Sequence, residues 1–291
     1  MSQSQPLKAA AWMMGAVVSF TSMAVAGRAI ALELDTFEIM LYRSLLGLVV
    51  VLSVGGFAGT LGQINRQSLG LHFIRNICHF TGQNLWFFAL TLITLPQLFA
   101  FEFSVPLWVA LFAPIFLSER LTRARLLSAV IGFAGILIVA RPDQIGLNAG
   151  IIAAALAALG FTGTGIATKL LTRKQSVTCI LFWLTAMQAV FGLIAAGYDG
   201  DIALPNAHNW PWVILIGLAG LFAHFCITRA LQLAPAVVVY PMDFVRLPLA
   251  AVIGILFYNE PFQVLVFLGA AIILGANFFN IRSEHRQTAT G

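Results

Sequence analysis

The segments ALTLITLPQLFAFEFSVP (residues 89–106) and ALQLAPAVVVYPMDFVRL (residues 230–247) occupy equivalent places in this chain. Shifting the sequence against itself by 141 residues aligns them without a gap and brings Glu102 onto Asp243. The same shift aligns Phe20 with Phe161, Thr21 with Thr162, Arg28 with Lys169, Phe103 with Phe244, Glu119 with Glu260 and Arg141 with Arg282. Because one register is kept through charged positions, residues 142–282 are predicted to duplicate residues 1–141, with a tail at residues 283–291.

The composition predicts that most of this chain of 291 residues is surrounded by lipid. Hydrophobic residues make up 60% of it and charged residues only 9%, whereas soluble domains carry about a quarter charged residues. The basic residues behind the net charge of +5 are scattered over short loops, which argues against a nucleic-acid partner. The cysteines Cys78, Cys179 and Cys226 lie in apolar segments without metal-ligand spacing, so we expect buried, reduced thiols.

Ten apolar stretches are long enough to cross a hydrocarbon core about 30 Å thick. They cover residues 8–29, 37–58, 69–93, 97–117, 124–140, 148–170, 177–197, 211–232, 236–258 and 262–280. A transmembrane barrel would instead need alternating segments of about ten residues. The sequence therefore predicts an all-α membrane protein with ten transmembrane helices.

Loop charges predict the orientation of these helices. The loops on the side of the N-terminus carry eleven basic residues: Lys8, Arg66, Arg120, Arg123, Arg125, Lys169, Arg173, Lys174, Arg229, Arg282 and Arg286. Because cytoplasmic loops are enriched in Lys and Arg, both termini are predicted to lie in the cytoplasm, with the protein in the inner membrane. Five spans per half is an odd number, so the second half enters the membrane upside down and the two halves form inverted five-helix repeats.

Inverted repeats are typical of secondary transporters that expose a central site to each side in turn. The sequence shows no GxSxG, HExxH or Walker motif, so neither an enzyme nor a bound cofactor is predicted. A channel and an intramembrane enzyme are the alternatives from other classes. We expect as partners the bilayer and a small-molecule substrate, with a coupling proton or a counter-substrate as a further option, and a monomer or homodimer.

The paired five-span halves and three segments resemble the ten-span, EamA-type branch of the drug/metabolite transporter superfamily. The segments are MLYRSLLG (residues 40–47), APIFLSERLTRARLLSAVIGFAGILIVARP (residues 113–142) and its counterpart AVIGILFYNEPFQVLVFLGAAIILGANFFNIR (residues 251–282). The resemblance covers nearly the whole chain and implies a carrier of small metabolites. It also implies a hinge at Glu119 and Glu260, which helix capping explains equally well. The segments RSLLG, LGLHFIRNICHF (residues 69–80) and LSER are similar in sequence to the S-adenosylmethionine uptake branch of this family. Riboflavin and amino-acid carriers share much of this similarity.

Charged residues at membrane depth are candidates for function because they are costly to insert. Glu102 and Asp243 are repeat equivalents in proline-interrupted spans, and such spans mark transport sites. The two carboxylates are predicted to bind a cationic substrate or a coupling proton. The alternative is an internal ion pair, since Asp243 and Arg246 are three residues apart. Arg43, in the second span, is predicted to hold an anionic substrate group or a carboxylate such as Glu102.

The third span carries polar residues on one helical face. His72, Arg75, His79, Gln83 and Trp86 recur at intervals of three and four residues. Asn84 flanks this face, His224 is the eighth-span equivalent of Gln83, and Tyr240 is an aromatic candidate for the cavity wall. These side chains are predicted to line a cavity or to pair with neighbouring helices. For His72 and Arg75, near the helix start, we expect anchoring at the membrane interface.

We therefore expect a substrate cavity between the halves, lined by spans 1, 3, 4, 6, 8 and 9. S-adenosylmethionine or a related amino-acid-like or nucleoside-like metabolite is the leading candidate. Its sulfonium would suit Glu102 or Asp243, its adenine Trp86, and its carboxylate Arg43 or Arg246. Riboflavin or another aromatic compound is the runner-up, and an organic anion follows if the acids leave the arginines without a partner.

Overall fold

The computed structural model describes residues 5–30, 33–117, 123–140, 148–259 and 264–290. Every regular element in these ranges is a helix, and none is a strand. The chain is therefore all-helical over the described residues, as the sequence predicts. Glu119 and Glu260, the expected hinge residues, lie outside these ranges.

The helices follow the predicted spans closely. In the first half they are α1 (Pro6–Ile30), α2 (Thr36–Phe57), the 3₁₀ turn η1 (Leu61–Gln63), α3 (Leu69–Leu92), α4 (Leu95–Glu102), α5 (Val105–Phe116) and α6 (Arg123–Ala140). In the second half they are α8 (Ala149–Leu171), α9 (Val177–Ala196), α10 (Trp210–Leu233), α11 (Ala236–Val239), η2 (Tyr240–Val245), α12 (Arg246–Tyr258) and α13 (Val264–Thr290).

Six stretches within the described residues are long and apolar enough to cross a membrane. They are Leu7–Ile30, Thr36–Phe57, Gln97–Phe116, Ala149–Leu171, Val177–Ala196 and Trp210–Leu233. Helix α3 has a spanning length of 24 residues, but its polar face lowers its hydropathy. Helices α6 and α13 contain shorter apolar stretches, Leu126–Ile138 and Phe267–Ala276. The protein is thus a multi-pass helical membrane protein.

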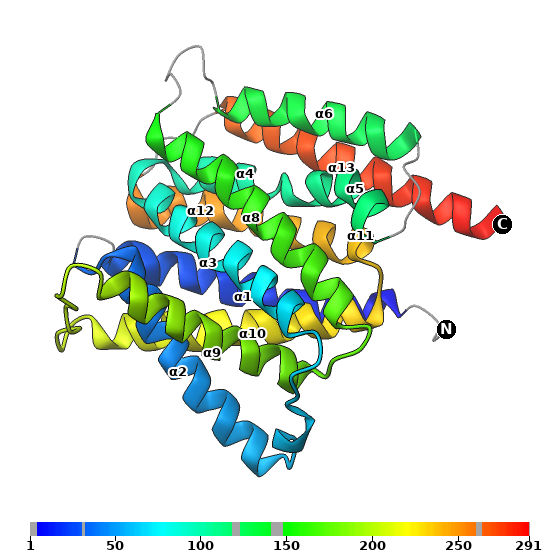
Figure 1. The fold of residues 1–291 in the computed structure, drawn as a ribbon. Coiled ribbons are helices and arrows are strands. Elements are labelled where there is room, and N and C mark those ends of the chain that lie inside the picture. The colour runs from blue at the N-terminus through cyan, green and yellow to red at the C-terminus, as the bar shows by residue number, and fades with distance from the viewer. Residues whose placement is uncertain (1–4, 31–32, 118–122, 141–147, 260–263, 291) are drawn as a thin grey trace.

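The main helix contacts join one half of the chain to the other. Helix α1 packs on α10, α3 on α8, α2 on α9, and α6 on α13. In Figure 1, α6 and α13 run side by side along the top of the molecule, while α1, α2, α9 and α10 form its lower part. The start of α1 and the end of α13 lie on the same side of this view (Figure 1). Most of the packing therefore depends on both halves being present.

Close approach of α3 and α8 requires glycine at their contact. A Cβ atom on Gly160 would lie 2.8 Å from the carbonyl oxygen of Cys78 and 2.9 Å from the Cα atom of Gly82. Small residues of this kind let the backbones of two membrane helices pack directly on one another. The contact brings the polar face of α3 against the second half.

The two spans that carry Glu102 and Asp243 are interrupted. Helix α4 ends at Glu102, α5 begins at Val105 with a proline in its first turn, and Asp243 lies in the 3₁₀ turn between α11 and α12. Proline lacks a backbone N–H and disrupts a continuous helix. Both carboxylates thus lie at helix breaks, as the proline positions in the sequence predict.

Arg28 and Lys169, which the repeat aligns, make equivalent contacts. The Arg28 guanidinium donates to the carbonyl oxygens of Leu90 (3.3 Å) and Ile93 (2.9 Å). The Lys169 ammonium donates to those of Leu231 (2.7 Å) and Ala234 (3.0 Å), the same positions 141 residues later. A cation at a helix C-terminus satisfies carbonyls that lack an intrahelical partner and complements the helix dipole. Each cation therefore stabilises the end of α3 or of α10.

Loops gather at both ends of the helices. At one end, the Asn65 amide donates to Gln175 (3.0 Å) and the Trp183 indole donates to the Asn65 carbonyl (2.8 Å). At the other end, the amides of Asn206 and Asn209 donate to the Glu33 carboxylate at 3.0 and 2.8 Å. These two hydrogen bonds lower the pKa of Glu33. The loop between α1 and α2 is thereby joined to the loop between α9 and α10.

Substituting either cation should destabilise the fold. We expect Lys169→Met to lower the free energy of unfolding by about 1.5–3 kcal/mol, the range for hydrogen bonds to charged groups. Arg28→Met should have a similar effect. Thermal unfolding of the purified protein in detergent measures both, with Lys174→Met, an exposed lysine five residues further on, as the control. Equal melting temperatures for Lys169→Met and the control would contradict this role.

Candidate functional site

A cavity of about 800 Å³ lies between the two halves of the chain. Side chains of α1, α3, α8 and α10 line it, together with the broken segments α4–α5 and α11–α12. These are the spans that the sequence predicts to surround the site. Seven of the predicted site residues are among the lining side chains: His79, Gln83, Trp86, Glu102, His224, Tyr240 and Asp243.

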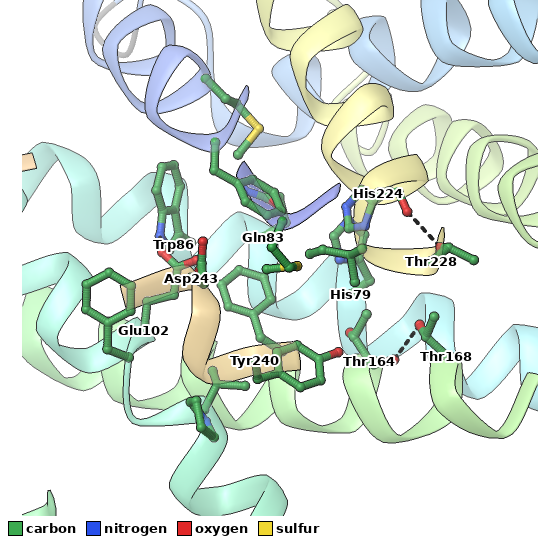
Figure 2. A pocket seen from close by; sticks show the side chains of 18 of the residues that line it. His79, Gln83, Trp86, Glu102, Thr164, Thr168, His224, Thr228, Tyr240 and Asp243 are labelled. Atoms are coloured by element: carbon green, nitrogen blue, oxygen red, sulfur yellow. Dashed lines mark hydrogen bonds between the residues drawn. The ribbon is translucent and has the colours of Figure 1, made fainter. Parts of the chain in front are cut away.

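The two carboxylates share one arginine at one end of the cavity. The Arg246 guanidinium donates to Glu102 Oε1 at 2.6 Å and also contacts Asp243 Oδ2. The Trp86 indole donates to the other oxygen of Glu102 at 2.9 Å. Figure 2 shows Glu102, Asp243 and Trp86 grouped together. The Asp243–Arg246 ion pair that we set against a cation site is therefore present, and the Glu102–Arg246 ion pair connects the two halves.

The Arg246 side chain is 1% exposed and surrounded by aromatic rings. Its guanidinium carbon lies 4.9 Å from the ring centroid of Phe20, 4.8 Å from that of Phe99 and 5.5 Å from that of Phe103. Contacts with ring faces contribute to holding a desolvated cation. These rings and the two carboxylates together fix the guanidinium at the centre of the protein.

The other end of the cavity holds two histidines. The rings of His79 and His224 meet edge to face with centroids 4.5 Å apart, and Figure 2 shows them beside Thr164, Thr168 and Thr228. Arg75 Nε donates to the Thr168 hydroxyl at 2.7 Å. Several buried atoms of the lining have no hydrogen-bond partner among the described residues: His79 Nδ1 and Nε2, His224 Nε2, Gln83 Nε2 and Arg75 Nη1. Since unpaired buried polar groups are costly, these atoms are suited to a polar ligand.

The predicted anchoring of His72 and Arg75 at the membrane interface is wrong. Their side chains are 0% and 1% exposed, and Arg75 lines the cavity. Packing of α3 on α8 covers Arg75, while the Trp183 ring of α9 lies 6.2 Å from the His72 ring. Distance from the helix start is therefore a poor guide where neighbouring helices cover that end.

Arg43 and Asn84 do not line the central cavity. Asn84 donates to the Phe80 carbonyl oxygen of its own helix at 2.8 Å. Arg43 lies in a second cavity of about 290 Å³, whose wall also includes His79 and His224. The hypothesis that Arg43 pairs with Glu102 does not match the structure, because Arg246 occupies that carboxylate.

The sequence analysis missed several lining residues on the first, sixth and eighth spans. Met13 and Met23 come from α1, Thr164 and Thr168 from α8, and Thr228 from α10. The three threonine hydroxyls donate to carbonyl oxygens of their own helices, a common arrangement in apolar helices. The sequence around these residues does not differ from the sequence around residues that only pack between helices. The only available signal was the alignment of Phe20 and Phe161, both of which line the cavity.

A multi-pass helical bundle with a partly polar cavity between two halves is typical of membrane transporters. In agreement, the model of the EamA-like transporter family matches this chain twice, over residues 7–141 and 148–282. The chain belongs to this family. Membership of this family fits a protein that transports a small molecule without catalysing a reaction on it.

Comparison with named proteins places similar chains among metabolite transporters. A riboflavin transporter of Brucella anthropi is 30% identical, with 78% of this chain and 81% of the relative aligned. An S-adenosylmethionine uptake transporter of Rickettsia bellii is 24% identical over 94% of both chains. A crystal structure at 17% identity has a TM-score of 0.73 over 96% of this chain and 98% of the other, which supports the fold.

Removing the shared arginine should destabilise the protein strongly. Arg246→Met leaves two carboxylates, each 15% exposed, without their cation, and breaking such a buried pair costs about 3–5 kcal/mol. Thermal unfolding in detergent measures the loss. The triple variant Arg246→Met/Glu102→Gln/Asp243→Asn should recover most of it, because it removes all three charges. A wild-type melting temperature for Arg246→Met alone would refute the charge pairing.

Proposed function

We propose that this protein is a ten-span secondary transporter that moves a small polar organic metabolite by alternating access. In this proposal, residues 1–141 and 142–282 form two inverted five-helix repeats in the inner membrane, with both termini and the tail at residues 283–291 in the cytoplasm. The observation that carries it is the central cavity, whose lining comes from both halves. A site at such a boundary is exposed to each side in turn when the halves change their relative tilt.

The loop contacts support the inverted arrangement. The loop before α3 bonds to the loop between α8 and α9, and the sequence predicts both to be cytoplasmic. The loop between α1 and α2 bonds to the loop between α9 and α10, and both are predicted to be external. Equivalent contacts of Arg28 and Lys169 then occur at opposite ends of the helices, as inversion requires.

Two features of the cavity favour a planar heteroaromatic substrate. Rings of Phe20, Phe161, Trp86 and Tyr240 contribute to its wall, and such walls accept flat ligands by stacking. Unpartnered nitrogen atoms of His79, His224 and Gln83 are available to bond ring heteroatoms. Riboflavin and S-adenosylmethionine, after which relatives are named, both contain a planar heteroaromatic ring system.

Between these two, the charge arrangement favours a riboflavin-like compound. Arg246 binds both Glu102 and Asp243, so a sulfonium group would have to compete with a bound guanidinium. Arg75 has no acidic partner among the described residues. The end of the cavity away from the carboxylates is therefore suited to neutral or anionic polar groups. We rank a riboflavin-like substrate above S-adenosylmethionine.

Uptake into liposomes tests this ranking. Purified protein should accumulate or exchange radiolabelled riboflavin with saturable kinetics, and unlabelled riboflavin should compete more strongly than S-adenosylmethionine. His79→Ala should lower the apparent affinity about tenfold, because one of the unpartnered side chains is lost. Stronger competition by S-adenosylmethionine would reverse the ranking, and non-saturable flux would favour a channel.

Neutralising one carboxylate should impair transport more than folding. Glu102→Gln keeps an acceptor for the Trp86 indole but weakens the bond to Arg246, which joins the halves during each cycle. We expect substrate flux to fall at least about tenfold with a well-formed melting transition. Asp201→Asn, at an exposed carboxylate in the loop between α9 and α10, is the control and should retain full flux. Wild-type flux in Glu102→Gln over the whole pH range would exclude a role for this charge in the cycle.

Cysteine labelling tests the orientation. Single cysteines at the exposed positions Ala207 and Lys174, in a variant without the three native cysteines, should react with an impermeant maleimide on opposite sides. Intact cells should be labelled at residue 207, and inverted vesicles at residue 174. Labelling of both positions from the same side would overturn the inverted ten-span topology.

A further inference from the structure

The second cavity contains a buried arginine that the proposed transport mechanism leaves unused. Arg43 is 7% exposed, and its one described hydrogen bond runs from Nη1 to the sulfur of Met40 at 3.6 Å. Thioether sulfur is a weak acceptor. No acidic side chain among the described residues forms an ion pair with Arg43. This differs from Arg246, which has two carboxylates.

The residues around Arg43 form a small chamber. Its wall includes Ser44, Thr185 and Gln188. The charged and titratable groups acting near it are Arg43, Arg75, His79 and His224, all cationic or neutral. The local charge is therefore positive.

Glycines of α10 create the room for this guanidinium. A Cβ atom on Gly220 would lie 2.6 Å from Arg43 Nη2, and one on Gly217 would lie 3.5 Å from the Arg43 Cα atom. The guanidinium is thus held beside α10, with the chamber in front of it.

The chamber adjoins the central cavity through the two histidines. His79 and His224 belong to the walls of both, so a ligand in one lies against the same imidazoles as a ligand in the other. We propose that the Arg43 chamber binds a small oxyanionic group, a carboxylate or a phosphate. The anion belongs either to the transported metabolite or to a separate small ion. The first source rests on the proposed transport function, whereas the second does not.

An anion fits the chamber for a simple electrostatic reason. A buried cation without a counter-charge is costly, and an oxyanion would supply both the charge and acceptors for the guanidinium. Arginine presents its N–H groups in a planar fork that matches the two oxygens of a carboxylate or phosphate.

Thermal unfolding of the purified, full-length protein tests the site without measuring transport. Sodium acetate or sodium phosphate is added in increasing amounts, and the salt of a bulky sulfonate replaces it in the control at the same ionic strength. In the same assay, riboflavin is compared with its phosphate ester, flavin mononucleotide. A ligand that binds the folded state raises the melting temperature. In the wild type we expect a rise either with the free anions or with the phosphate ester beyond that of riboflavin. A rise with the free anions would show that a separate ion binds in the chamber. A larger rise with the phosphate ester than with riboflavin would show that the chamber binds an anionic group of the substrate.

Variants make the test specific to Arg43. Arg43→Met should weaken the anion response at least about tenfold, since a charge-assisted hydrogen bond is lost, and Arg43→Lys should recover part of it. Gly220→Ala keeps the charge but displaces the guanidinium, so it should also weaken the response. Arg66→Met, an exposed arginine in a loop, is the control and should respond as the wild type does.

Without added anion, Arg43→Met should melt at or above the wild-type temperature, because it removes an uncompensated buried charge. A large fall in the melting temperature would assign Arg43 a structural role and overturn the proposal. An absent anion response, or one that persists in Arg43→Met, would also overturn it. If riboflavin flux is absent but the Arg43-dependent anion response is present, the transport proposal fails while the anion site stands.

Discussion

A guanidinium buried in a membrane protein is most stable when it is paired with acidic groups and hydrogen-bonded, since its desolvation costs several kcal/mol. Arg246 meets these conditions with a carboxylate from each half of the chain and three surrounding aromatic rings. Glu102 and Asp243 can take part because both lie at breaks in their helices, where the chain enters the centre of the bundle. The position of the central cavity follows from this arrangement, because the same carboxylates form one of its ends.

The cavity has two chemically different ends. At one end, Glu102 and Asp243 both bind Arg246, and at the other, Arg75 and the His79–His224 pair contain donors without acidic partners among the described residues. A transporter must bind its substrate firmly enough to select it and loosely enough to release it. Pairing the carboxylates internally leaves ring stacking and neutral hydrogen bonds to bind the ligand, and these are moderate interactions. This division favours an uncharged aromatic group near the centre and a polar group towards the histidines.

The family relationship explains the architecture better than it explains the substrate. Both matches to the EamA-like model cover helices and their packing, and relatives of similar identity are named for two different metabolites. The residues that differ between the halves are more informative here. Arg246 aligns with Val105, Arg75 with Ile216 and Arg43 with Leu184, so each buried arginine occurs in one half alone. Asymmetry of this kind adapts a duplicated scaffold to one ligand.

The sequence by itself determined the helical class, the duplication, most helix ends and the two interrupted spans, because hydrophobic length, register and proline are local properties. It also pointed to seven residues that the structure brings to one cavity, since charged and polar groups are rare at membrane depth. It did not determine the partners of the charges. Glu102 pairs with Arg246, 144 residues away, instead of with Arg43, and Arg75 is covered by α8 instead of facing the interface. Those choices depend on which helices pack against one another, and that is decided by contacts between the halves that no local pattern contains.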